Sequence, residues 1–357
     1  MPDFAKDFKI DLTNAKIPKA DGEVNEYVNA EAAANGKYFT DKRKVIFVNG
    51  MKNTGENHAE SALALSLVQM CPVIGLYNLS DGAIVDLWQC LNDKLQFQGP
   101  GADSAKEKID SRNSWWNRIL KGERTSEQAM EQALKRNPAQ VALFKLLRKP
   151  ENRTREIFAH SQGNLILSNV LQGIAAVDGP SAIAGRVVHT FGSPAVFYPD
   201  GILKYEHGFT FDPVNWLSGF DSSFTISKVG LPTGTKNPIT HGFLWYLQDD
   251  PRFIINRFRT GGWGMTFNMD EAGLAKCLAA METNLPRVKK VIDYLDKHQN
   301  SDADDVALLY VQAIQNKPSV KLALKSDPEL VKLLVKTMDE GWTSGKEKEA
   351  INWLKAL

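Results

Sequence analysis

The segment Ala159-His-Ser-Gln-Gly163 constrains the fold more than any other part of this chain. Residues 155–159 lead into it with the composition of a short strand, and residues 163–177 leave it with apolar side chains at helical spacing. A serine between a strand and a helix, with small residues two positions before and after it, is typical of a sharp turn. Larger side chains at 159 and 163 would collide with the neighbouring backbone. We therefore expect Ser161 to stand clear of a sheet, at the N-terminus of a helix.

Apolar runs alternate with helical patterns on both sides of this turn. A strand followed by a helix and another strand, repeated along the chain, indicates a parallel sheet with helices on both faces. The expected strands span residues 44–50, 73–77, 155–159, 186–191 and 208–211, and the expected helices between them span 57–70 and 163–177.

Other segments suggest additions to this α/β core. We expect an N-terminal edge segment over residues 1–40 and a core over 41–260, with a helical cap inserted at 81–150. The glycine-rich stretch 260–264 closes the core, and residues 265–357 form a C-terminal helical region. The helices expected there span 271–283, 287–299, 303–316, 328–339 and 346–356.

Composition excludes several classes of protein. The 357 residues are 43% hydrophobic and 24% charged with a formal net charge of +1, so no overall field attracts nucleic acid. The three cysteines are odd in number and unevenly spaced, which argues against a disulfide framework or a zinc site. We expect neither a metal nor a cofactor.

The first residues lack the basic and then apolar layout of a signal peptide. The longest apolar stretch, 61–79, is interrupted by Gln69 and Pro72, so no transmembrane segment is expected. We expect a protein that is cytoplasmic as synthesised and that, if exported, leaves without a cleavable leader.

A serine hydroxyl is a poor nucleophile without a base. The turn at Ser161 resembles that of the α/β-hydrolases, and this resemblance implies that an acid and then a histidine follow the serine along the chain. Among the six histidines, His241 satisfies this order, in a loop that leads into a helical pattern beginning at Phe243. His207 precedes the best acid, and His298 lies in the helical tail. The alternative for His241 is a capping or hydrogen-bonded loop histidine.

Asp212 is the expected acid. It directly follows the predicted strand 208–211, where a carboxylate reaches across the carboxyl edge of a parallel sheet. Asp200 and Asp221 are alternatives in looser segments. Because Asp212 precedes a proline, it could also simply begin a turn.

An oxyanion formed at Ser161 needs two N–H donors. We expect one from the backbone of Gln162, the residue after the serine, and one from Met51, where Gly50 lets the loop turn tightly. An ordinary Asn-Gly turn is the alternative for this loop. Asn49 and His160 flank these donors and are expected to contact substrate.

Together these segments resemble an α/β-hydrolase, closest in pattern to class 3 (fungal-type) lipases and bacterial lipase- or phospholipase-like proteins. The resemblance covers roughly residues 40–260 and is carried by Val45–Met51, Ala159–Asn164, Thr190–Ala195 and Asp212–Val214 with His241. Ala159 replaces the usual glycine, and Asn164 replaces a commoner small residue. Similar His-Ser-Gln-Gly turns occur in bacterial phospholipase toxins, which implies action on membrane lipids.

The cap segment bears on the substrate. Residues 104–150 hold eleven Lys and Arg against five Asp and Glu, a local charge of +6, and include Trp115 and Trp116. Indole rings and basic side chains suit contact with anionic lipid headgroups, so peripheral membrane contact and substrate contact by these tryptophans are expected. The alternative is a solvated cap whose tryptophans turn inward.

The sequence thus predicts a serine ester hydrolase that cleaves acyl esters of lipids through Ser161, Asp212 and His241, either as a membrane-targeting effector or as a housekeeping lipase. Two alternatives stay open. The first is a non-catalytic α/β-hydrolase-like binding protein, and the second is a thioesterase or acyltransferase with the same triad. The C-terminal helices could extend the core, dock a protein partner or bind an inhibitor.

Overall fold

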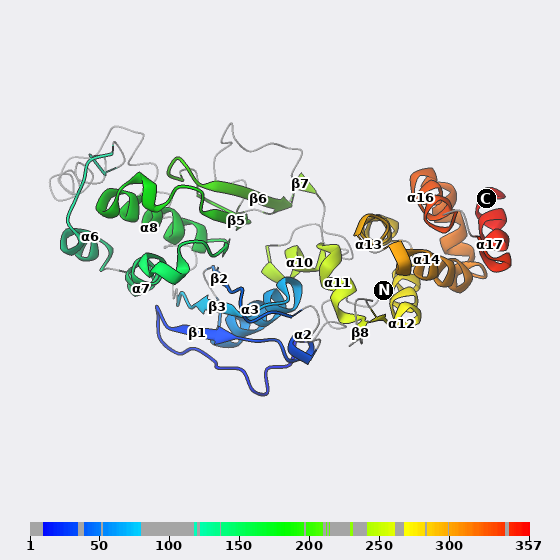
Figure 1. Ribbon diagram of the computed structural model, residues 1–357, viewed down its shortest axis with the longest axis horizontal. Helices are drawn as coiled ribbons and strands as arrows, with labels where there is room; N and C mark the ends of the chain where they lie inside the picture. The colour runs from blue at the N-terminus through cyan, green and yellow to red at the C-terminus, as the bar shows by residue number, and fades with distance from the viewer. Residues whose placement is uncertain are drawn as a thin grey trace.

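The computed structural model describes most of the chain. The described residues are 10–34, 39–50, 53–79, 118–119, 122–135, 137–195, 198–209, 212, 214, 229–230, 241–260, 268–282, 284–298, 300–339 and 343–357. They form a mixed α/β structure around one large sheet, with a group of helices beyond one end of it (Figure 1).

The sheet has the strand order β1-β3-β2-β4-β5-β6-β7. Six of its strands run parallel, and β1 pairs antiparallel with β3 at one edge. The mostly parallel sheet predicted from the alternating pattern is therefore confirmed. The strands are β1 (Val24–Tyr27), β2 (Val45–Val48), β3 (Val73–Leu76), β4 (Ile157–His160), β5 (Val187–Phe191), β6 (Leu203–Phe209) and β7 (Val229–Gly230).

The central strands are buried on both faces, which explains their continuous apolar sequences. Successive side chains of β2 enter two different hydrophobic clusters, because side chains alternate across a strand. Val45 and Phe47 join a cluster that includes α3 (Gly55–Gln69), whereas Ile46 and Val48 join one that includes α8 (Gly163–Asp178). Helices therefore cover both faces of the sheet.

Further helices complete the two layers. The α8 side also holds α6 (Glu127–Leu134) and α7 (Pro138–Arg148), which lie within the predicted cap segment. The α3 side holds α10 (Phe243–Gln248) and α11 (Pro251–Arg257), and α2 (Ala30–Ala34) lies beside α3. Asn256 of α11 donates hydrogen bonds to the carbonyl oxygens of Leu67 and Val68 in α3, at 3.0 and 3.2 Å.

The C-terminal helices form a group beyond α11 (Figure 1). They share the hydrophobic cluster of the α3 side, and the Arg287 guanidinium donates to the carbonyl oxygen of Gln248. The short strands β8 (Arg259–Thr260) and β9 (Asn268–Met269) precede α12 (Glu271–Ala280), α13 (Leu285–His298), α14 (Asn300–Ile314), α15 (Pro318–Lys325), α16 (Pro328–Met338) and α17 (Gly345–Lys355).

Several elements go beyond the sequence prediction. Strand β1 and helix α15 are among those that were not predicted, and β6 begins at Leu203 rather than at 208. Polar and apolar residues mix at the start of β6, where Leu203 and Tyr205 are half-exposed. This part of the strand therefore lacks the continuous apolar run that predicts a buried strand. No helix among the described residues is long and apolar enough to cross a membrane.

Candidate active site

The turn between β4 and α8 holds Ser161 in a left-handed backbone conformation, with φ of 55°. Such a conformation is unusual for a residue with a side chain and is found mainly where the surroundings enforce it. Here the Ser161 N–H donates to the carbonyl oxygen of Phe191, at the end of β5, at 2.9 Å. The turn between strand and helix predicted from the sequence is therefore present, and it is strained at the serine itself.

Two glycines allow the chain to pass closely around Ser161. A side-chain carbon at Gly163 would lie 2.6 Å from the carbonyl oxygen of Val48, and one at Gly50 would lie 2.4 Å from Cβ of Ser161. Neither space admits a methyl group. The end of β2 and the turn after β4 are thus pressed together, which explains the need for small residues on both.

Asn164, where the sequence departs from the lipase-like pattern, ties this turn to the neighbouring strand. Its amide donates to the carbonyl oxygens of Ser161 and Phe191 at 3.0 and 3.3 Å, and its side-chain oxygen accepts from the Tyr198 hydroxyl at 3.0 Å. Asn164 is fully buried. The sequence indicated no role for it, because Phe191 and Tyr198 lie 27 and 34 positions further along the chain.

Asp212 and His241 lie together at the same edge of the sheet. Asp212 follows β6, and its two carboxylate oxygens lie 2.8 and 2.7 Å from Nδ1 of His241. The carboxylate also accepts from the Val214 N–H at 2.9 Å and from the Tyr246 hydroxyl at 2.5 Å. The structure therefore brings together the acid and the base that the chain order selected.

The charge of Asp212 is stabilised although the side chain is wholly buried. Burial by itself raises the pKa of this carboxyl, but hydrogen bonds from His241, Tyr246 and Val214 and the charge of the imidazole outweigh it. The pKa of Asp212 consequently lies below the usual range for aspartate. The acid is held ionised and pointed at the imidazole.

The imidazole of His241 is fixed from its other side by His160. Nε2 of His160 lies 2.6 Å from the backbone oxygen of His241, and the two rings stack with centroids 4.7 Å apart. Gly192, at the end of β5, also lies against this group: a side-chain carbon there would be 2.6 Å from Asp212 and 2.7 Å from Cε1 of His241. The ends of β4, β5 and β6 therefore converge on one place.

Nε2 of His241 is buried and has no hydrogen-bond partner among the described residues. Because the carboxylate of Asp212 can only accept, Nδ1 of His241 carries the proton and Nε2 of the neutral ring has a lone pair. The geometry leaves Nε2 able to take a proton.

His160 itself is uncharged. Burial, followed by repulsion from His241, lowers the pKa of His160 to about 3. Nε2 of His160 lies against the backbone oxygen of His241, and its contact with substrate stays a prediction.

Asn49 also forms hydrogen bonds with neighbouring groups of the protein. Its amide donates to the oxygens of Gly50 and Asn78 at 2.7 and 3.0 Å, and its oxygen accepts from the Asn78 N–H at 2.8 Å and lies 2.8 Å from Nδ1 of His58. Asn78 in turn donates to the Gln162 side chain at 2.9 Å. The loop after β2 is thus locked to the serine turn.

Of the two expected oxyanion donors, Gln162 is among the described residues. The Gln162 backbone N–H meets no backbone acceptor among the described residues and stands at the positive N-terminal end of α8. Met51, Trp115 and Trp116 lie outside the described residues, as does Asp221. Asp200 is exposed in the turn before β6.

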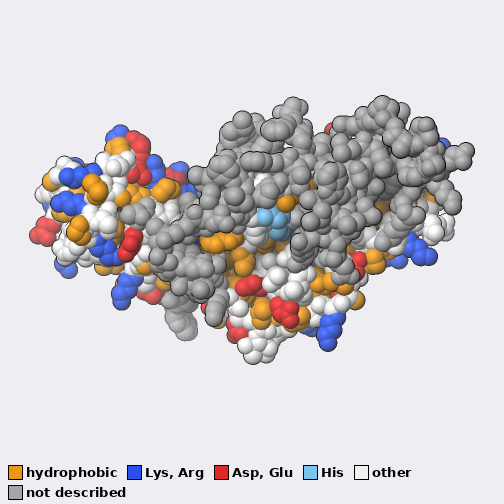
Figure 2. Space-filling view, turned by 180° about the vertical axis from the view of Figure 1, so that it is seen from behind, with side chains coloured by type: hydrophobic (Ala, Val, Ile, Leu, Met, Phe, Trp, Pro, Cys, Tyr) orange, Lys and Arg blue, Asp and Glu red, His pale blue; other side chains and the backbone are white. Residues whose placement is uncertain are grey.

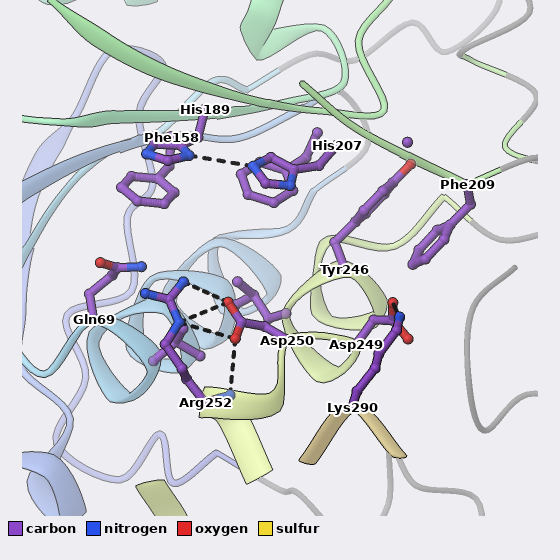
Figure 3. Close-up of a pocket in the computed structure, with 14 residues that line it drawn as sticks. Gln69, Phe158, His189, His207, Phe209, Tyr246, Asp249, Asp250, Arg252 and Lys290 are labelled. Atoms are coloured by element: carbon purple, nitrogen blue, oxygen red, sulfur yellow. Dashed lines mark hydrogen bonds and ion pairs between the residues drawn. The ribbon is translucent and has the colours of Figure 1, made fainter. Parts of the chain in front are cut away.

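A cavity of about 390 Å³ lies beside Tyr246. Figure 3 shows Phe158, His189 and His207 along one wall and the Asp250–Arg252 pair along another. Nδ1 of His189 lies 3.4 Å from Nε2 of His207. Neither Ser161 nor His241 lines this cavity.

The described residues contain no group of three or more His, Cys, Asp or Glu side chains that could hold a metal ion. Seen from behind, histidine side chains lie beside hydrophobic ones near the centre of the molecule (Figure 2).

Comparison of the chain with protein-family models, curated proteins and solved structures found no match.

Proposed function

We propose that this chain is a serine ester hydrolase with an α/β-hydrolase fold, in which Ser161, His241 and Asp212 form the catalytic triad. One observation carries the proposal. A buried carboxylate holds Nδ1 of an imidazole whose Nε2 has no hydrogen-bond partner among the described residues, and His160, which contacts His241, directly precedes the serine on its strained turn. This combination of acid, base and nucleophile activates a hydroxyl for attack on a carbonyl.

In the proposed reaction, the Ser161 hydroxyl attacks the ester carbonyl while Nε2 of His241 takes its proton. The carbonyl oxygen becomes an oxyanion, which the N–H groups of Gln162 and Met51 stabilise. As the oxyanion collapses, the ester C–O bond breaks, and His241 returns the proton to the departing alcohol. Water then attacks the acyl-serine by the same route and releases the acid.

The substrate class rests on the resemblance to lipases. We propose acyl esters of lipids or phospholipids as substrates, with peripheral membrane contact through the predicted cap segment, of which α6 and α7 pack against the sheet. Ser161 is only 3% exposed, so small esters are the better first substrates.

Ester hydrolysis by the purified chain tests the proposal. Ser161→Ala should abolish turnover of short p-nitrophenyl esters, whereas Ser326→Ala, a serine at the end of α15, should leave it unchanged. Equal turnover in Ser161→Ala and the unaltered chain would refute the assignment.

Liposomes of phosphatidylcholine and phosphatidylglycerol, compared with acyl thioesters, test the substrate class. Release of fatty acid from the liposomes supports a lipase. A chain that turns over thioesters but no lipid would instead be a thioesterase or acyltransferase, and inactivity on all these substrates would favour the non-catalytic alternative.

A further inference from the structure

Tyr246 contacts the acid of the proposed triad directly. It belongs to α10, the helix that begins just after His241, and its hydroxyl lies 2.5 Å from Oδ2 of Asp212. That oxygen also accepts from Nδ1 of His241 at 2.7 Å. Tyrosine and histidine therefore share one carboxylate oxygen. The other oxygen accepts from the Val214 N–H at 2.9 Å and lies 2.8 Å from Nδ1 of His241.

The ring of Tyr246 is held in place by other aromatic rings. Phe209 stacks on it with centroids 4.1 Å apart and planes 17° apart, and Phe191 meets it edge-on at 5.7 Å. Figure 3 shows the Tyr246 ring beside Phe209, with its hydroxyl at the end remote from helix α10. This packing holds the hydroxyl where it donates to Asp212.

A donor on the shared oxygen has two effects. It holds the carboxylate in the plane that meets His241, and it withdraws part of the negative charge that would otherwise stabilise the protonated imidazole. The acid and the base titrate as a coupled pair, so a donor to the acid alters the behaviour of both.

We propose that Tyr246 is a positioning residue that aligns Asp212 with His241 and sets the pH range in which this pair accepts a proton. This role rests on the proposed function, since it concerns the acid and base of that reaction. The other titratable group that faces the pair among the described residues is His160, which stacks on His241.

Tyr246→Phe removes the hydroxyl and keeps the packed ring. Without that donor, the charge of Asp212 is less stabilised, and the acid limb of the profile of kcat/KM against pH should move to higher pH, by about half to one unit. We expect kcat to fall about 3- to 10-fold with little change in KM, because the hydroxyl is bonded to Asp212.

Tyr310→Phe is the matched control. Tyr310 lies in α14, and its buried hydroxyl has no hydrogen-bond partner among the described residues. Its replacement removes the same atom from the interior and should leave the pH profile unmoved. A profile that shifts equally in both variants, or in neither, would overturn the proposal.

A second measurement does not depend on turnover. In proton NMR, the hydrogen between His241 and Asp212 should give a far-downfield resonance that is lost in His241→Gln. We expect Tyr246→Phe to change its chemical shift and to raise the pH at which it titrates, and Tyr310→Phe to change neither. If the chain cleaves no ester but this resonance behaves as expected, the proposed function fails, whereas the alignment of Asp212 with His241 by Tyr246 stands. If the chain is active but Tyr246→Phe leaves both readouts unchanged, the positioning role alone fails.

Discussion

Replacement of Asp212 by asparagine tests how far the buried acid controls His241. The amide has the shape of the carboxylate, but one of its two ends must be an NH₂ group. In the structure, one carboxylate oxygen accepts from Tyr246 and His241, and the other from Val214 and His241. Whichever way the new amide is oriented, its NH₂ group therefore faces a donor.

The conflict at His241 is relieved when the imidazole moves its proton from Nδ1 to Nε2. Nδ1 then accepts from the new amide, but Nε2 can no longer accept a proton from Ser161. The substitution thus keeps the shape of the site and removes the base from the proposed reaction.

The expected loss in Asp212→Asn is about 10⁴-fold in kcat, the size typical for this replacement in a serine–histidine–aspartate triad. One buried donor is left without an acceptor, which should lower the free energy of unfolding by about 1–3 kcal/mol. Hydrolysis of a p-nitrophenyl ester gives the first quantity and urea unfolding gives the second.

Asp200→Asn is the control for Asp212→Asn, because Asp200 is the exposed alternative acid before β6. It should change neither kcat nor stability. The reasoning about the acid would be refuted if kcat fell less than tenfold in Asp212→Asn. It would also be refuted if kcat fell more in Asp200→Asn than in Asp212→Asn.

Three further predictions concern other parts of the molecule. Gly50→Ala should destabilise the chain by about 1–3 kcal/mol and impair hydrolysis, because the new carbon would lie 2.4 Å from Cβ of Ser161; urea unfolding and ester turnover check it. Burial lowers the pKa of both His58 and His160 to about 3, so the unfolded chain binds more protons below about pH 6.5. The free energy of unfolding should therefore be highest above that pH and fall by up to about 2.7 kcal/mol per pH unit on acidification, as urea unfolding at several pH values would measure. Replacement of the Trp115-Trp116 pair by alanines should weaken sedimentation with anionic vesicles while short esters are still cleaved, and unchanged sedimentation would contradict membrane contact by this pair.

Much of the sheet could be predicted from the sequence because its central strands are buried on both faces and are therefore apolar throughout. The turn at Ser161 could be predicted because its requirements are local: a strand, small residues at 159 and 163, and a helix. Asp212 and His241 followed from chain order alone, and the structure places them in contact.

The sequence patterns could not predict contacts between distant segments. In the sequence, Tyr246 is one of several apolar residues of a short helix. Its contact with Asp212, 34 positions earlier, becomes visible only in the folded chain. Asn78 likewise meets Gln162 only because β3 and β4 both flank β2. Sequence spacing also could not reveal that the Asn49 amide donates to the oxygens of Gly50 and Asn78.

The central claim, that Ser161 is an activated nucleophile, is tested most directly by a fluorophosphonate probe followed by mass spectrometry of the digested chain. An activated serine reacts with such a probe, and an idle one does not. The account predicts one covalent adduct on the peptide that contains Ser161, absent from Ser161→Ala and strongly reduced in His241→Gln. A folded chain that shows no adduct on this peptide, or labelling that persists in Ser161→Ala, would contradict it.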